Sequence, residues 1–213
     1  MIKLTPARII ALIIFIYSSI VMAGWIFNND ALTRFLPSQP SMTFVTAFTF
    51  WSCAIGIWLI DLIFTDHSEI SLVLLPANIM LIILMVTTIL AAGIYKVHTG
   101  ITDLFLEGNN PVGSPLPGVP AIGTIVGFLE YCICATTVLF DSKPWKRLIT
   151  YLGIFIIVMG FVAILGYLLK LPILYSVISE SSVPMSPNTA TTFVLLGLDM
   201  VLLERNSKHY ENK

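Results

Sequence analysis

The chain has 213 residues, of which 57% are hydrophobic and 11% charged, and its net charge is −1. The charged share is less than half of the roughly 25% usual in soluble domains, so there is too little polar surface to enclose a water-soluble globule. The charge balance and the absence of a basic run give no indication of nucleic-acid binding. We therefore expect one all-α integral membrane domain over residues 1–213, placed in the cell membrane.

Six mainly apolar segments follow one another along the chain, each close to the roughly 20 residues that a membrane-spanning helix needs. The predicted helices are 6–27, 42–64, 71–95, 120–140, 145–169 and 187–204. Pro6 stands in a first turn, where its missing N–H costs nothing, and Pro76 lies in the first turns of the third helix. No alternating strands of about ten residues occur, which excludes a barrel. The predicted fold is a six-helix transmembrane bundle.

The distribution of Lys and Arg predicts the orientation, because cytoplasmic loops carry an excess of these residues. Six spans place both termini and two short connections on one side, together with eight of the eleven Lys and Arg residues. The other three are Arg34, Lys96 and Lys170. We therefore expect a multi-pass protein with both termini in the cytoplasm. The connections expected to face outward are 28–41, 96–119 and 170–186.

All three cysteines, Cys53, Cys132 and Cys134, fall inside apolar runs. A thiol in such a place behaves as a small hydrophobic group. Cys132 and Cys134 lack the spacing and the second ligand pair of a metal knuckle. We expect free cysteines that serve packing, no metal and no cofactor.

The six helices group into three hairpins whose outer connections resemble one another, with repeat units of about 6–64, 71–140 and 145–204. Each unit has a glycine at the outer end of its first helix: Gly24, Gly93 and Gly166. About eight residues later each has an apolar, partly aromatic cluster, followed by proline-rich chain. We interpret each cluster as a short amphipathic segment at the membrane interface.

The second helices of the first and third units begin alike. Met42, Thr46 and Phe50 align without a gap with Met185, Thr189 and Phe193, and Asp61 then aligns with Glu204. The middle unit is a weaker copy that keeps Thr124 and Phe128. The threonines alone are also explained by good helix starts after proline. The whole spaced pattern predicts three hairpins packed through equivalent faces around a pseudo-threefold axis.

These same residues carry a resemblance to a known family. The Gly24-Trp-Ile segment, the apolar pair Leu32 and Phe35, and the stretch from Val183 to Leu198 resemble the N-terminal membrane region of prokaryotic PAS-containing histidine kinases and diguanylate cyclases. The resemblance implies signal input at a membrane. Nine residues follow Glu204 here, so we expect a sensor module without the family's output domains.

Two carboxyl groups lie well inside predicted helices. Glu130 is near the middle of the fourth helix, and Asp199 lies toward the cytoplasmic end of the sixth. A charged Asp inside a membrane costs about 2.5–3.5 kcal/mol or more, so each group should face the bundle interior or be protonated. They are candidates for a proton relay or a ligand contact, or for structural hydrogen bonds between helices. No Lys or Arg is predicted at their depth, so we expect hydroxyl or backbone partners and no fixed buried ion pair.

The leading functional hypothesis is a non-enzymatic membrane sensor or accessory subunit. It would act by lateral association with another membrane protein or a second copy, or by responding to a membrane-borne cue in contact with lipid. No signature of a hydrolase, metalloprotease or nucleotide-binding enzyme is present. The runner-up is a small transporter or channel that uses Glu130 and Asp199. The spans are apolar all round, without the continuous polar face of a pathway, which favours the first hypothesis.

Overall fold

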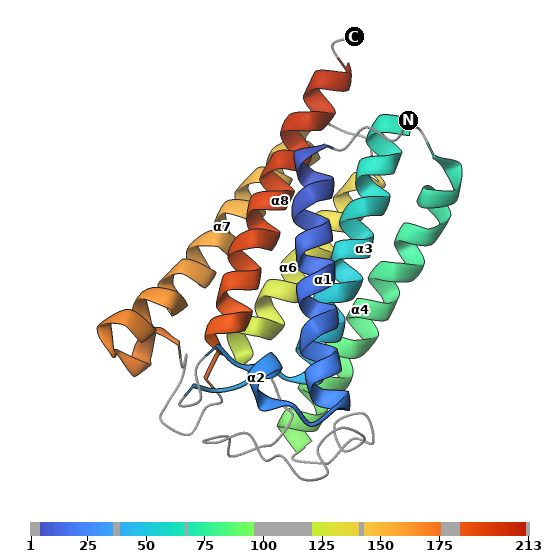
Figure 1. Cartoon of the computed structure of the whole chain (residues 1–213). Helices are drawn as coiled ribbons and strands as arrows, with labels where there is room; N and C mark the ends of the chain where they lie inside the picture. Colours follow the sequence, from blue (N-terminus) through green and yellow to red (C-terminus); the bar gives the residue numbers. More distant parts are fainter. Residues whose placement is uncertain are drawn as a thin grey trace.

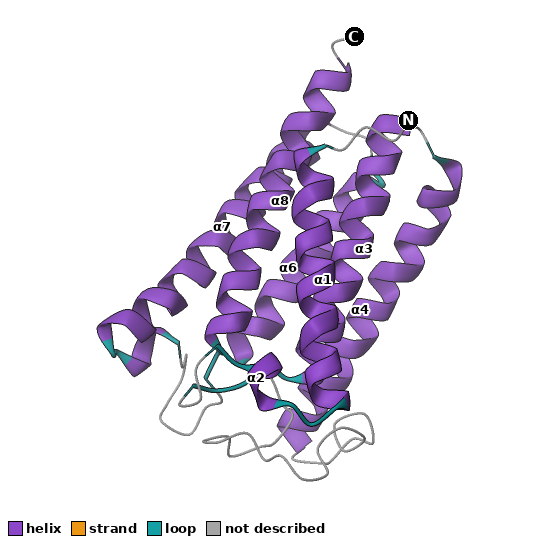
Figure 2. Cartoon of the chain, viewed as in Figure 1, coloured by secondary structure: helices purple, strands orange, loops and turns teal. Residues whose placement is uncertain are grey.

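The computed structural model describes residues 5–35, 39–66, 68–95, 121–140, 143–175 and 184–211. The described residues form seven α-helices and a short 3-10 helix, with no strand among them (Figures 1 and 2). Their bounds are α1 Pro6–Ile26, α2 Asp30–Thr33, α3 Phe44–Asp66, α4 Glu69–Tyr95, α6 Ile122–Val138, α7 Lys143–Leu169, η1 Pro172–Leu174 and α8 Pro187–Glu211. The protein is therefore all-α in every part described, as the composition predicts.

The six long helices begin and end within a few residues of the predicted positions, with one larger difference. Helix α8 continues to Glu211, seven residues beyond the predicted end at Glu204. The prediction ended where the apolar residues end, but the polar continuation can still hold helical hydrogen bonds once it leaves the lipid. In α4, which begins at Glu69, Pro76 lies inside the helix.

Four of the described helices are long and apolar enough to cross a membrane, over Pro6–Ile26, Phe44–Asp66, Glu69–Ala91 and Arg147–Leu169. Helix α6 is a shorter apolar helix, and α8 is not among the four. Residues such as Asn188, Asp199 and Glu204 make α8 more polar than its neighbours. Length and apolar character therefore identify a membrane protein with at least these four candidate spans.

Three helices, α3, α6 and α8, meet at the centre of the bundle through Phe50, Phe128 and Phe193. The three ring centroids are 4.7–5.2 Å apart, in edge-on and tilted arrangements that aromatic rings favour. Helix α1 packs against α3 and α8, α4 against α3 and α6, and α7 against α6 and α8. Each of these three outer helices therefore contacts two of the central ones.

The distribution of exposed apolar side chains follows this arrangement except on α6, which exposes Ile122, Val126, Leu129 and Ile133. Exposed apolar side chains are frequent on α1, α4 and α7, for example Ile13, Leu84 and Phe155. None of the large apolar side chains described on α3 is exposed, and on α8 only Leu198 is. Apolar side chains facing outward are expected where the surrounding solvent is lipid. The outer helices thus shield α3 and α8 from that solvent.

Candidate functional site

The turn that follows α1 and the turn that follows α7 make corresponding contacts. Asn28 and Lys170 both have positive φ, 53° and 56°, and reverse the chain after the helix. A Cβ atom on Gly24 would lie 2.7 Å from Cβ of Leu32, and one on Gly166 would lie 2.8 Å from Cβ of Leu174. Each glycine therefore provides the space in which the following apolar turn packs onto the end of its helix.

The start of the next helix is held in the same way in both hairpins. Trp25 Nε1 donates a hydrogen bond to the Met42 carbonyl, and the Tyr167 hydroxyl donates one to the Met185 carbonyl, each at 2.8 Å. Thr46 shares a 2.8 Å hydroxyl–hydroxyl hydrogen bond with Thr43, and Thr189 shares one with Ser186. Met42, Thr46, Met185 and Thr189 are all buried. These residues thus fix the outer ends of α3 and α8.

The Thr33 carbonyl at the end of α2 joins three parts of the chain. It accepts a hydrogen bond from the Met42 amide at 3.0 Å and one from Asn188 Nδ2 at 3.1 Å. Thr33 and Asn188 are both buried. The carbonyl therefore links α2 to the chain that leads into α3 and to the first turn of α8.

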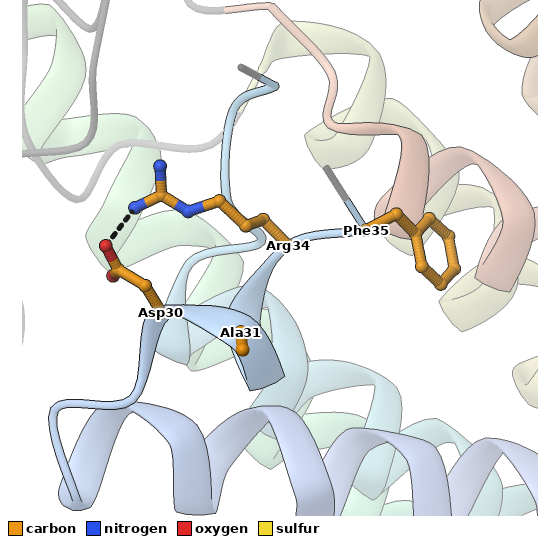
Figure 3. Close-up of a pocket in the computed structure, with 4 residues that line it drawn as sticks. All are labelled: Asp30, Ala31, Arg34 and Phe35. Carbon is orange, nitrogen blue, oxygen red and sulfur yellow. Dashed lines mark ion pairs between the residues drawn. The ribbon is translucent and has the colours of Figure 1, made fainter. Parts of the chain in front are cut away.

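A cavity of about 300 Å³ lies beside α2, lined by Asp30, Ala31, Arg34 and Phe35. Asp30 and Arg34 form an ion pair at 2.8 Å, and the ring of Phe35 points away from that pair (Figure 3). Asn29 caps α2 by accepting a hydrogen bond from the Ala31 amide at 3.1 Å. This α2 pocket combines an ion pair with an exposed aromatic ring. It lies at the end of the bundle opposite the start of α1 (Figure 1).

A group of polar residues is buried at the other end, between α1 and α3. Arg8 Nε donates to Asp61 Oδ2 at 2.6 Å, Arg8 Nη2 donates to the Thr65 hydroxyl at 2.9 Å, and Thr5 donates to Asp61 Oδ1 at 3.2 Å. The side chains of Arg8 and Asp61 are 2% and 0% exposed. The Trp58 ring covers the guanidinium, with its centroid 5.8 Å from Cζ. We call Thr5, Arg8, Asp61 and Thr65 the α1–α3 polar cluster.

The α1–α3 polar cluster contains a buried ion pair that the sequence does not predict. The distribution of Lys and Arg places Arg8 on the cytoplasmic side, and Asp61 aligns with Glu204 in the repeat, but neither pattern pairs the two residues. Helical spacing places Arg8 on the same buried face as Ala11 and Ser18, which the sequence signals only through the small residues at those positions. The pairing itself depends on the packing of α1 against α3.

Asp199, a predicted candidate, is completely buried on α8, and neither carboxyl oxygen has a hydrogen-bond partner among the described residues. It lies close enough to Asp61 for the two carboxyl groups to interact electrostatically. Its predicted place in the bundle interior is therefore observed. The expected hydroxyl or backbone partner is not.

Glu130 is only partly buried on α6, and its buried oxygen Oε2 has no hydrogen-bond partner in the described part of the chain. The hydrogen bond predicted for this group is not seen at that oxygen. Glu130 is thus separate from the α1–α3 polar cluster, and the structure does not join the two predicted carboxyl groups into one site.

The remaining predicted positions are distributed over the bundle. Thr124 is buried on α6, one turn before Phe128 of the aromatic centre. Gly93 lies in α4, and the connection 96–119 that follows it is outside the described residues. Cys53, Cys132 and Cys134 are buried and free. Within the described ranges no group of three or more His, Cys, Asp or Glu residues is placed to hold a metal ion.

Comparison with known proteins gives no further guide to these sites: the chain matches no family model, and no curated protein or solved structure resembles it significantly.

Proposed function

We propose that this protein is a non-enzymatic membrane sensor or accessory subunit that receives an amphiphilic, membrane-borne cue at the α2 pocket. The observation that carries the proposal is the hydrogen bond from Asn188 to Thr33, which ties the pocket-bearing helix α2 directly to the first turn of α8. Helix α8 then runs along the bundle to the end where α1 begins (Figure 1). We propose that a conformational change at the pocket reaches the other end of the bundle through α8, which is one continuous helix.

The residues of the α2 pocket indicate the chemistry of the cue. Arg34, which pairs with Asp30, supplies a positive charge for an anionic group, and the exposed ring of Phe35 suits an apolar chain. A molecule with both features is an amphiphile such as an acidic lipid. The outer turn also exposes Phe27, which lies at the end of α1 next to α2 and favours contact with the interface.

The proposal includes six spans, with α6 and α8 crossing beside the four apolar helices, and both termini in the cytoplasm. The Lys and Arg distribution and the shared end of the bundle at which α1 starts and α8 finishes support it (Figure 1). A cysteine introduced at Ser142 should resist a membrane-impermeant thiol reagent in intact cells and react after the membrane is opened. Labelling in intact cells would overturn this orientation.

We also propose that the three hairpins are copies of one unit. The corresponding contacts at Gly24 and Gly166, at Met42 and Met185, and the meeting of the three phenylalanines support this. The repeat accounts for the central position of α3, α6 and α8, which are the second helices of the three units.

Trp58, which covers Arg8, provides a reporter for the sensor hypothesis at the end opposite the pocket. In a variant that keeps Trp58 as its one tryptophan, emission is compared in phosphatidylcholine vesicles with and without phosphatidylglycerol. We expect the anionic lipid to shift the Trp58 emission and Arg34→Ala to abolish the shift. An emission that ignores the lipid composition would contradict the proposed cue.

Two asparagines allow a matched test of the route through α8. Asn188→Ala removes the hydrogen bond to Thr33, whereas Asn78→Ala removes a similar bond, at 3.2 Å, from Asn78 Nδ2 to the Ser52 carbonyl between α3 and α4. We expect the lipid response of Trp58 to be lost in the first variant and kept in the second. Equal responses in both variants would show that α8 does not carry the signal.

A second candidate function, transport, is favoured by the completely buried and unpartnered carboxyl group of Asp199. Ion flux into vesicles that contain the purified protein would test it. Flux that disappears in Asp199→Asn would favour transport over sensing. The absence of flux, together with a lipid response at Trp58, would favour the sensor.

A further inference from the structure

We propose that Asp199 is a proton-binding site inside the bundle, and that its proton allows α8 to pack beside the Arg8–Asp61 ion pair. The inference does not depend on the nature of the cue at the α2 pocket. It concerns the opposite end of the molecule and a group that the sensor hypothesis leaves without a role.

The surroundings of the Asp199 side chain require a neutral group. The residue is 0% exposed, and both oxygens lack a hydrogen-bond partner among the described residues. An ionised carboxylate taken out of water needs a counter-charge or several hydrogen bonds. A proton on one of the oxygens removes the charge, and a neutral carboxyl group costs far less to bury than a carboxylate.

The charged and titratable groups near Asp199 come from several helices. Helix α3 presents Asp61, a like charge, and α6 presents the buried Tyr131, both near Asp199. Helix α1 presents Arg8, the partner of Asp61. On α8 itself, Glu204 lies five residues further and is also buried. Helix α7 contributes Gly153 and Ile157, which do not titrate, near Gly197.

The guanidinium of Arg8 is engaged by α3. Its Nε and Nη2 donate to Asp61 and Thr65, and Nη2 also lies 3.5 Å from Asp66 Oδ2. If Asp199 lost its proton, a second carboxylate would compete with Asp61 for Arg8 across the α1–α3–α8 contact. Protonation of Asp199 therefore favours the observed packing, in which Arg8 forms its ion pair with Asp61.

The α1–α3 polar cluster extends from the buried interior to an exposed side chain. Asp66, next to Arg8, is 61% exposed on its side chain, whereas Asp61 is completely buried. In this proposal a proton exchanges between Asp199 and water by way of this polar cluster, which extends from the buried Asp61 to the exposed Asp66. The site thus belongs to the end of the bundle where α1 begins and α8 finishes.

Infrared spectroscopy of the purified full chain tests the proposal, because a protonated carboxylic acid has a carbonyl band distinct from that of a carboxylate. At neutral pH we expect this band in the wild-type protein and its reduction in Asp199→Asn. Glu130→Gln is the matched control, since it removes the carboxyl group inside α6 and should leave the Asp199 component. An identical band in wild type and Asp199→Asn would overturn the proposal, as would a band that only Glu130→Gln reduces.

A second measurement on the wild-type chain avoids dependence on a variant that fails to fold. A folded state that keeps a proton already released by the unfolded chain loses stability as the pH rises. Raising the pH should therefore lower the unfolding midpoint. An infrared band that persists unchanged through that transition would show that the stability loss arises elsewhere and would overturn the assignment to Asp199.

Discussion

The hairpins α1–α3 and α7–α8 have corresponding outer turns but are held together along their length by different means. In the first, Arg8 of α1 forms a buried ion pair with Asp61 of α3. In the second, Gly153 and Gly160 of α7 and Gly197 of α8 bring the helix backbones together: Cβ atoms on Gly160 and Gly197 would lie 2.6 Å and 2.5 Å from carbonyl oxygens of the opposite helix. Polar contacts and small residues are the two common ways to associate helices in a membrane.

The difference shows that a shared turn does not impose a shared helix interface. The outer turn is determined locally, by a glycine and the apolar residue packed on it. The interface depends on which side chains the two helices present over several turns. The α1–α3 hairpin consequently contains a buried ion pair, and the α7–α8 hairpin has glycines in its interface.

Among the variants that test this comparison, the removal of Asp61 should lower the free energy of unfolding most. Asp61→Ala leaves the Arg8 guanidinium buried without its principal partner, and breaking one side of a buried pair costs about 3–5 kcal/mol. The free energy of unfolding, measured in mild detergent, should fall by that amount. The double variant Arg8→Met/Asp61→Leu should recover most of the loss, because it removes both charges. No recovery would mean that the ion pair is not what joins α1 to α3.

Adding a methyl group at the α7–α8 interface should cause the second-largest loss of stability. Gly197→Ala directs a Cβ atom against the Gly153 carbonyl, and overpacking of this kind typically costs about 1–3 kcal/mol. Thermal unfolding of the purified chain measures the loss. Leu198→Ala, on the exposed side of the same helix turn, is the control and should change the midpoint far less. If the two variants behaved alike, the close backbone contact would not be holding this hairpin.

Loss of a single hydrogen bond at the third outer turn should have a smaller effect. Tyr167→Phe removes the bond to the Met185 carbonyl and keeps the ring stacked on Tyr175, whose centroid is 4.1 Å away. We expect a destabilisation of about 0.5–1.5 kcal/mol by denaturant titration. Trp25→Phe should cost more, because it removes the corresponding bond and part of a buried ring. A silent Tyr167→Phe would show that the two turns are not equivalent in energy.

The smallest effect on stability is expected at the α2 pocket. Asp30→Asn weakens an ion pair whose aspartate is 55% exposed, and such pairs contribute about 0.2–1 kcal/mol. The unfolding midpoint should hardly change, whereas the response of Trp58 to anionic lipid should change markedly. A strong loss of stability would show that the pair serves the fold and would remove support for a ligand site there.

Several residues of the candidate sites could be located from the sequence, but the residues that they contact could not. The spacing of Gly24 and Gly166 from their apolar clusters marked both outer turns, because that local geometry needs a residue without a side chain. The depth of Asp199 in an apolar helix marked it for the interior. Nothing in the sequence around Arg8 indicated Asp61, 53 residues away, as its partner, nor did it indicate that Asn188 reaches Thr33.

Composition and apolar segments by themselves determined that the protein is all-α and suited to a membrane, because a chain with so few charges cannot cover itself in water and a backbone in lipid must satisfy its own hydrogen bonds. They also placed the six long helices to within a few residues, apart from the polar end of α8. Only the tertiary structure decided which helices are central, where the aromatic rings meet and which charge is paired. Those properties arise from contacts between segments distant in sequence, and the hydrophobic pattern of helices that are apolar all round does not specify which face meets which neighbour.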